Sequence, residues 1–118
     1  MELIREIKLY ENHFSNFYKE QTQDVKEKID EVLYFIRVIQ RLSNRFLKHI
    51  EGVKGLYEIR VMVGSNIYRI FCTFDEGNLV ILFNGFQKKD QKTPKKEIDM
   101  AKKLMKDYFE KKDKHLKK

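Results

Sequence analysis

The feature that most constrains the fold is a hydrophobic period of two in the middle of the chain. Apolar and polar side chains alternate there in short runs, which is typical of strands that bury one face. Turn-forming residues at 64–66 and at 75–78 separate the runs. The three predicted strands are 57–63, 67–74 and 79–83. Because short turns join neighbouring antiparallel strands, we expect a three-strand antiparallel meander.

The first turn fixes which residues of the meander face one another. A two-residue loop at Gly64-Ser65 pairs Val63 with Asn66, and the same register puts Arg60 directly opposite Arg69. Both arginines then lie on the face turned away from the apolar side chains of the hairpin. A three-residue loop would shift the register by one and move Arg69 to the other face.

This arginine pair has two interpretations. Like charges directly opposite each other destabilise a ladder by about 0.2–1 kcal/mol. A bound anion such as a phosphate would offset the repulsion, and we favour this interpretation. In the alternative, each arginine is a structural residue paired with Glu58 or another acid. Arginines locked against carboxylates under packed cover would count against an anion site.

Helical periodicity precedes the meander. The segment 11–20 has three aromatic residues at helical spacing, and the segment 22–42 has apolar residues at alternating steps of four and three. The apolar residues of the second segment are Val25, Ile29, Val32, Ile36 and Ile39. We expect these helices to form a two-helix hairpin after a short strand over 3–9. The segment 43–55 is expected to be a short helix or an irregular link.

A last helix is predicted after the meander, with Thr93 as its N-cap and Pro94 at its first position. Its apolar stripe consists of Ile98, Ala101, Leu104 (or Met105) and Tyr108. The expected fold class is therefore α+β: an N-terminal strand, a two-helix hairpin, an antiparallel three- to four-stranded sheet and a C-terminal helix. A chain of 118 residues is the size of one domain. We expect this domain to span 1–113, followed by a basic, mobile tail over 114–118.

The positive charge of the chain is concentrated at its C-terminal end. Residues 1–86 have 12 basic and 12 acidic side chains, whereas 87–118 have 13 lysines and six acids and so carry the whole net charge of +7. Five lysines between the last strand and the last helix are expected to bind a polyanion such as RNA. They are Lys88, Lys89, Lys92, Lys95 and Lys96. For the final eight residues we expect a solvated end that only aids solubility.

Composition excludes several other classes. One cysteine excludes a disulfide framework, and Cys72 is expected to be a buried thiol. Three histidines spread over the chain do not have the spacing of a zinc site, and no glycine-rich phosphate loop is present. We therefore expect no metal and no cofactor. No apolar run approaches the roughly 20 residues of a membrane span, and no signal-peptide pattern opens the chain, so no membrane association and a cytoplasmic location are expected.

Three runs of residues resemble a known family. They are Gly55-Leu56-Tyr57-Glu58-Ile59-Arg60, Ile67-Tyr68-Arg69-Ile70-Phe71, and Asn84-Gly85-Phe86-Gln87-Lys88-Lys89 with the following segment 91–98. In this order they are similar to the RelE/ParE toxin superfamily, in particular the HigB-like, phage-derived branch of bacterial type II toxin–antitoxin systems. The resemblance implies a RelE-like fold and a small ribonuclease that cuts mRNA in the ribosomal A site. It also implies a cognate antitoxin, frequently a helix-turn-helix repressor.

The resemblance implies roles for individual residues. Arg69 matches the phosphate-binding arginine of the family, Arg60 matches a basic position on the preceding strand, and Lys88 or Lys89 matches the basic group after the last strand. These four are the candidate catalytic residues. Lys92, Lys95 and Lys96 are the candidate RNA-binding residues.

Cleavage without a metal uses the neighbouring 2′-hydroxyl of the RNA as nucleophile, and guanidinium groups suit the phosphate because they bind its oxygens in pairs. Glu58 stands where some relatives have a basic residue. The tyrosine or histidine that transfers a proton in several relatives has no clear counterpart, because Tyr108 lies on the apolar stripe and His115 in the tail. We favour partial burial without chemistry for His49. The general base and acid therefore stay unassigned.

Two other functions stay open from the sequence. One is a ParE-like inhibitor of DNA gyrase that cuts nothing, and the other is a basic RNA-binding module without catalysis. The arginine pair and the lysine segment favour the nuclease, because a protein that only binds gyrase has no evident use for a phosphate site.

Overall fold

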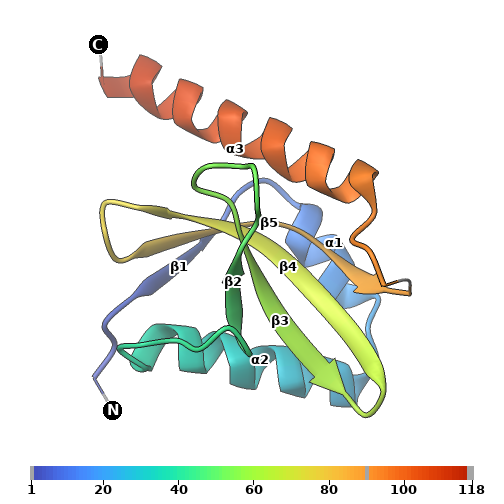
Figure 1. The fold of residues 1–118 in the computed structure, drawn as a ribbon. Coiled ribbons are helices and arrows are strands. Elements are labelled where there is room, and N and C mark those ends of the chain that lie inside the picture. Colours follow the sequence, from blue (N-terminus) through green and yellow to red (C-terminus); the bar gives the residue numbers. More distant parts are fainter. Residues whose placement is uncertain (1, 90, 117–118) are drawn as a thin grey trace.

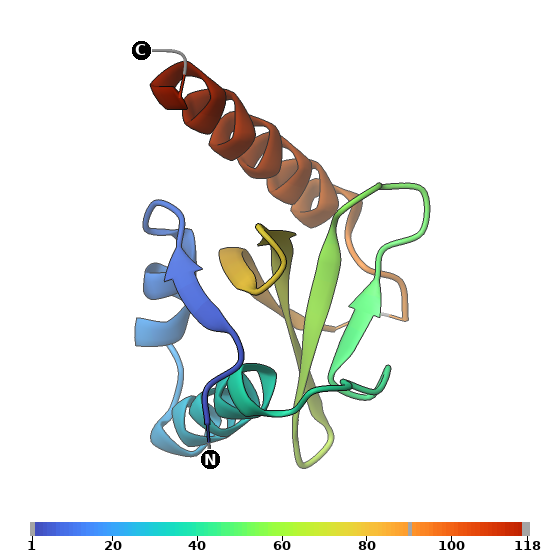
Figure 2. The same cartoon turned by 90° about the vertical axis from the view of Figure 1, so that its left-hand side faces the viewer.

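The computed structural model describes residues 2–89 and 91–116. One mixed sheet forms the centre of the molecule, with two helices on one face and the third helix on the other (Figures 1 and 2). The elements in chain order are β1 (Glu6–Leu9), α1 (His13–Lys19), α2 (Gln23–Val38), β2 (Leu47–His49), β3 (Tyr57–Val63), β4 (Asn66–Asp75), β5 (Leu79–Lys88) and α3 (Lys95–Leu116). The expected α+β class is confirmed.

The sheet has five strands, not the expected three or four, in the order β1-β5-β4-β3-β2. The meander β3-β4-β5 is antiparallel as expected, and β2 adds to it antiparallel through β3. The first strand differs from the expected antiparallel sheet, because β1 pairs parallel with β5 and Lys8 lies opposite Ile81. The two helices between β1 and the meander provide the long connection that a parallel pair requires.

Two segments before the meander differ from the prediction. The segment 43–55 contains the short strand β2, in which Leu47 lies opposite Ile59. The second helix ends at Val38 instead of 42, and the Arg5 guanidinium donates hydrogen bonds to the carbonyl oxygens of Ile36 and Ile39 there, at 2.9 and 2.6 Å. These bonds satisfy acceptors that the end of a helix leaves without intrahelical partners.

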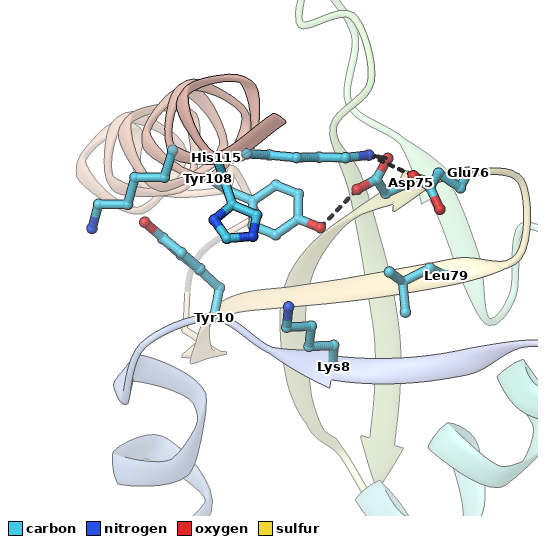
Figure 3. Close-up of a pocket in the computed structure, with 9 residues that line it drawn as sticks. Lys8, Tyr10, Asp75, Glu76, Leu79, Tyr108 and His115 are labelled. Atoms are coloured by element: carbon cyan, nitrogen blue, oxygen red, sulfur yellow. Dashed lines mark hydrogen bonds and ion pairs between the residues drawn. The ribbon is translucent and has the colours of Figure 1, made fainter. Parts of the chain in front are cut away.

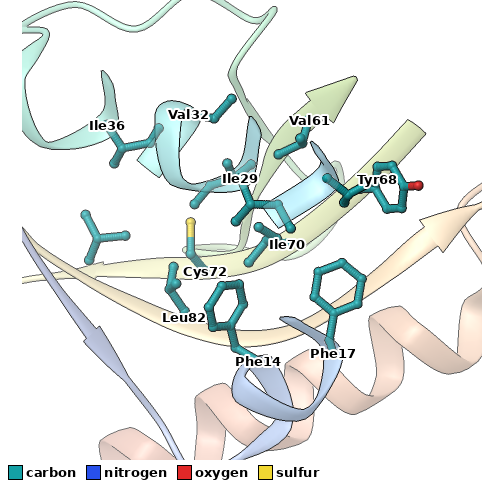
Figure 4. Close-up of a cluster of buried hydrophobic side chains, with 13 residues drawn as sticks. Phe14, Phe17, Ile29, Val32, Ile36, Val61, Tyr68, Ile70, Cys72 and Leu82 are labelled. Carbon is teal, nitrogen blue, oxygen red and sulfur yellow. The ribbon is translucent and has the colours of Figure 1, made fainter. Parts of the chain in front are cut away.

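One face of the sheet packs against α1 and α2. The cluster includes Ile59, Val61, Tyr68, Ile70 and Cys72, as the alternation predicts, together with Phe14, Phe17 and the apolar stripe of α2 (Figure 4). Full burial of a side chain of this size contributes about 1.5–3 kcal/mol, so this face holds α1 and α2 firmly in place.

The opposite face packs against α3. Its cluster consists of Leu56, Phe71, Ile81, Phe83 and Phe86 from the sheet side, with Ala101, Leu104 and Tyr108 from the helix. The helix begins at Lys95, one residue after Pro94, whose carbonyl accepts the N–H of Ile98. It continues to Leu116, so the expected mobile tail is helical over 114–116, and 117–118 lie outside the described residues.

The Asn84-Gly85-Phe86 run lies at a bulge of β5. Ile70 pairs with Gly85 but Cys72 pairs with Leu82, so two residues of β5 lie opposite Phe71 alone. Gly85 meets α1 so closely that a Cβ there would lie 2.5 Å from the Phe17 ring. The bulge also breaks the alternation of apolar and polar residues after Phe83. The sequence pattern therefore does not show that the strand continues, and β5 ends five residues beyond the predicted end.

No described helix combines the length and the apolar character needed to span a membrane.

Candidate functional site

The register of the first hairpin brings the two predicted arginines together. Val63 lies opposite Asn66 and Arg60 lies opposite Arg69, so the two-residue loop at Gly64-Ser65 is confirmed. Phe86 of β5 lies on the other side of Arg69. Paired residues of neighbouring strands share a face, so these side chains belong to the face that α3 partly covers.

A carboxylate lies between the two guanidinium groups. Glu58 is two residues before Arg60 on β3 and shares its face. Its Oε1 is 3.7 Å from Nε of Arg60, and its Oε2 is 3.6 Å from Nε of Arg69. The structural interpretation therefore holds for Arg69, whose buried contact with Glu58 counts against an anion site at that residue, whereas Arg60 is only partly buried. One negative charge cannot neutralise two positive ones, so the trio keeps a net positive charge.

The two arginines differ in exposure. The Arg69 side chain is 4% exposed and that of Glu58 is 8% exposed, whereas Arg60 is 29% exposed. Burial lowers the pKa of Arg69, the charge of Arg60 lowers it further, and Glu58 acts in the opposite direction. A guanidinium stays charged at neutral pH despite such a shift, so Arg69 is a fixed cation in a site with little water.

Backbone carbonyls orient both arginines. Nη1 of Arg69 donates to the carbonyl oxygen of Tyr68 at 3.3 Å, and Nη1 of Arg60 donates to that of Asn44 at 3.2 Å. The second bond turns Arg60 toward the segment before β2. There Arg60 lines a hollow of about 250 Å³ between the sheet edge and α2. The other lining residues are Met62, Arg45, Phe46, Lys28, Glu31, Val32 and Phe35. Arg45 is a cation that sequence reasoning does not single out, because the segment around it has no clear period.

The predicted lysines lie along the same end of the sheet. Lys88 is half-buried and lies opposite Ile67, two residues along β4 from Arg69 and on the same face. The other four are exposed: Lys89 follows β5, Lys92 lies in the connection to α3, and Lys95 and Lys96 form the start of α3. None of the five forms an ion pair with another residue that the structure describes.

The bulge of β5 positions the start of α3. Nδ2 of Asn84 donates to the backbone oxygen of Glu97 at 3.1 Å and to its Oε1 at 3.2 Å. This contact holds the first turn of the helix beside the strand. The N-terminus of a helix carries a partial positive charge, so Lys95 and Lys96 add to a potential that already attracts anions.

A second polar cluster lies at the other end of the sheet, around a pocket of about 410 Å³ (Figure 3). The Tyr108 hydroxyl donates to Oδ2 of Asp75 at 2.7 Å, and Nζ of Lys112 donates to Oδ1 at 2.7 Å. Burial raises the pKa of Tyr108 to about 12, and the bond to Asp75 acts in the same direction. Burial alone would raise the pKa of Asp75, but the bonds from Lys112 and Tyr108 outweigh it and hold that pKa below its usual range.

This second cluster corrects the expectation for the end of the chain. Two of the final eight residues are not merely solvated, because Lys112 forms ion pairs with Asp75 and Glu76, and Lys111 lies 3.2 Å from Asp107. Tyr108 is buried on the apolar stripe as predicted. Its hydroxyl also links α3 to β4 through the hydrogen bond to Asp75. Because its polar groups are largely paired with one another, we interpret the cluster as an anchor for α3.

The other candidate groups are structural. Cys72 is fully buried, and burial raises the pKa of its thiol, so it is not a nucleophile at neutral pH. His49 is exposed, which corrects the expected partial burial, and its Nε2 lies 3.0 Å from the carbonyl oxygen of Val53. His115 lines the second pocket (Figure 3), whose lining includes neither of the two arginines. Among the described residues, no group of three or more His, Cys, Asp or Glu side chains gathers as metal ligands.

Comparison with known proteins gives one finding. The family model described as “Phage derived protein Gp49-like (DUF891)” matches residues 12–106. The matched range begins just before α1 and ends within α3, so it contains both arginines and all five predicted lysines. Comparison with the curated proteins gives no match.

Proposed function

Because the chain belongs to the Gp49-like family of phage-derived proteins, which is associated with toxins of toxin–antitoxin systems, we propose that it is a toxin that cuts mRNA. The proposed activity is that of a metal-independent endoribonuclease acting on the translating ribosome. Arg60, Arg69, Lys88 and Lys89 are the proposed catalytic residues, and Lys92, Lys95 and Lys96 are the proposed contacts to the RNA backbone.

The observation that carries this proposal is the Arg60–Arg69 pair, in which Arg69 is buried and Arg60 is 29% exposed. Two guanidinium groups directly opposite each other repel, and Glu58 balances only one of the two charges. A phosphodiester brings the missing negative charge and offers oxygens that accept paired N–H donors. Five lysines without described ion partners lie toward the same end of the sheet, where they would attract the rest of the RNA backbone.

The chemistry needs little beyond these cations. The 2′-oxygen of the RNA attacks the adjacent phosphorus, and the bond from phosphorus to the 5′-oxygen breaks. The products are a 2′,3′-cyclic phosphate and a 5′-hydroxyl. The 2′-hydroxyl gives its proton to a base and the leaving oxygen takes one up, and neither group is assigned to a residue of this chain. Cations fixed beside the phosphate stabilise the charge that develops in the transition state.

The proposed partners follow from charge as well as from family. A surface with a segment of net charge +7 attracts an acidic or amphipathic segment, and a cognate antitoxin with such a segment would cover the cations that RNA needs. We propose that co-expression with a neighbouring antitoxin gene relieves the toxicity.

Inducible expression followed by mapping of mRNA 5′ ends tests the proposal. We expect growth arrest and new 5′ ends in frame with translated codons, and we expect both to disappear when translation is blocked. Uncut message with signs of DNA damage would contradict the nuclease and favour the gyrase inhibitor. Uncut message without toxicity would favour a binding module.

A further inference from the structure

The contact between Glu58 and the arginines is incomplete. Oε2 of Glu58 and Nε of Arg69 are both buried and 3.6 Å apart, yet neither forms a hydrogen bond within the structure. A buried polar atom without a hydrogen bond is costly, and native proteins contain few of them. The two atoms thus form an ion pair at 3.6 Å instead of a hydrogen bond, so each could bind another partner more strongly than it binds this one.

The charges around the contact lead to the same conclusion. Two guanidinium groups flank one carboxylate, and Lys48 of β2 lies opposite Glu58 on the same face. Carboxylate and phosphate oxygens accept the same paired N–H donors from arginine. A carboxylate held between two arginines thus resembles the ligand that such a pair binds. Glu58 is also part of β3 itself, so it is present whether or not a ligand is bound.

We propose that Glu58 is an internal anion that stands in for a phosphate group between Arg60 and Arg69, so that a phosphate binds there in competition with it. The inference rests on the proposed function for the identity of the natural ligand, a phosphodiester of RNA. In the free protein Glu58 limits the repulsion between the arginines. When a phosphate binds, Glu58 gives up part of its contact with each of them.

The substitution Glu58→Gln tests separately whether Glu58 limits the repulsion between the arginines and whether it competes with a bound phosphate. Glutamine keeps the size of the side chain but removes the charge that opposes a second anion. We expect the melting temperature in chloride buffer to fall by about 5 °C, because the arginines no longer have their counter-charge. We expect inorganic phosphate to bind at least about tenfold more tightly than to the wild type, since the competing charge is gone.

The experiment compares thermal unfolding of the full chain in phosphate and in chloride at equal ionic strength. The control is Glu110→Gln, which removes an exposed acid that lies 4.0 Å from Lys106 on α3 and gives the same net charge. Phosphate should raise the melting temperature of Glu58→Gln by several degrees more than that of the control or the wild type. This extra rise should be absent from the double variant Glu58→Gln with Arg60→Gln.

Two results would overturn the inference. One is an equal response of Glu58→Gln and Glu110→Gln to phosphate, which would make Glu58 a structural residue alone. The other is an extra rise that persists without Arg60, which would place the anion elsewhere. If Glu58→Gln does not fold, Glu58→Asp takes its place, because the shorter carboxylate withdraws from the arginines and should give an intermediate response to phosphate.

These measurements contain neither RNA nor ribosomes. A protein that shows the phosphate response but leaves mRNA intact would support the internal anion and contradict the nuclease. A protein that cuts mRNA without the phosphate response would support the nuclease and contradict the internal anion.

Discussion

At the scale of single residues, the site depends on how closely backbone and side chains approach one another. Arg69 is buried, and Phe86 and Arg60 lie opposite it in the neighbouring strands. Its position therefore depends on β5, and β5 in turn lies against α1 at Gly85. A small change at that glycine is expected to reach the arginine pair through the strand.

Gly85→Ala tests this dependence. The added Cβ would lie 2.5–2.9 Å from three atoms of the Phe17 ring, so either the ring or the strand must move. We expect the free energy of unfolding to fall by about 1–3 kcal/mol, measured by urea denaturation. In the double variant with Phe17→Leu the total decrease should be smaller than the sum of the two single decreases, because the smaller side chain makes room. Strictly additive effects would show that the two residues do not meet.

At the scale of the elements, α3 is held at both ends. Asn84 binds the first turn, and Asp75 binds Tyr108 and Lys112 in the second half of the helix (Figure 3). The lysines at the start of α3 owe their position to this double attachment. The cluster at Asp75 should also make the attachment depend on pH.

Asp75→Asn tests the pH dependence. The pKa of Asp75 is lower in the folded protein than its usual value of about 3.9, so its contribution to stability is complete above pH 4 and disappears as the pH falls through the folded pKa. We expect the free energy of unfolding of the wild type to fall by about 1–2 kcal/mol more than that of Asp75→Asn between pH 5 and pH 2, measured by denaturant unfolding at each pH. Parallel pH curves for the two proteins would contradict the anchor.

The lysines between β5 and the second turn of α3 are tested through salt. For single-stranded RNA, removing one lysine that binds a phosphate should reduce the slope of log affinity against log salt concentration by about 0.7. The triple change of Lys92, Lys95 and Lys96 to glutamine should thus reduce the slope by about 2, measured by fluorescence anisotropy with an RNA whose 2′-hydroxyls are methylated. The matched control replaces three exposed lysines elsewhere with glutamine, namely Lys19, Lys54 and Lys114. Equal slopes for the two triple variants would refute the predicted RNA contacts.

Sequence reasoning succeeds where local chemistry decides. The alternation over 57–63 and the two-residue turn determine the register, and with it the meeting of Arg60 and Arg69. Sequence reasoning fails where contacts between distant segments determine the structure. The three residues of β2 are too few to show a period, and the parallel pairing of β1 depends on a partner strand about 70 residues away.

The same contrast holds within the site. The pair of arginines follows from strand register, whereas Lys112 and Asp75 are 37 residues apart and no pattern links them. The sequence offers Glu58 as a possible partner of each arginine, but its place between both depends on side-chain conformations that the sequence does not specify.

At the scale of the whole molecule, the net charge and most of the hydrophobic core lie in different parts of the chain. The first 86 residues have no net charge and contain most of the core, whereas the last 32 carry +7. The arginine pair belongs to the neutral part and the lysines to the basic part. The sheet brings the two together, since β5 carries Lys88 past Arg69 and leads into α3.

The most direct measurement is the rate at which the Arg69→Lys variant cuts ribosome-bound mRNA. Lysine keeps the positive charge but not the planar set of donors that binds two phosphate oxygens. With thermal unfolding as a check that each protein is folded, we predict at least about a 100-fold slower rate for Arg69→Lys. The control Arg41→Lys, at an exposed residue after α2, should cut at the wild-type rate. Equal rates for a folded Arg69→Lys variant and the wild type would contradict the proposed role of the arginine pair.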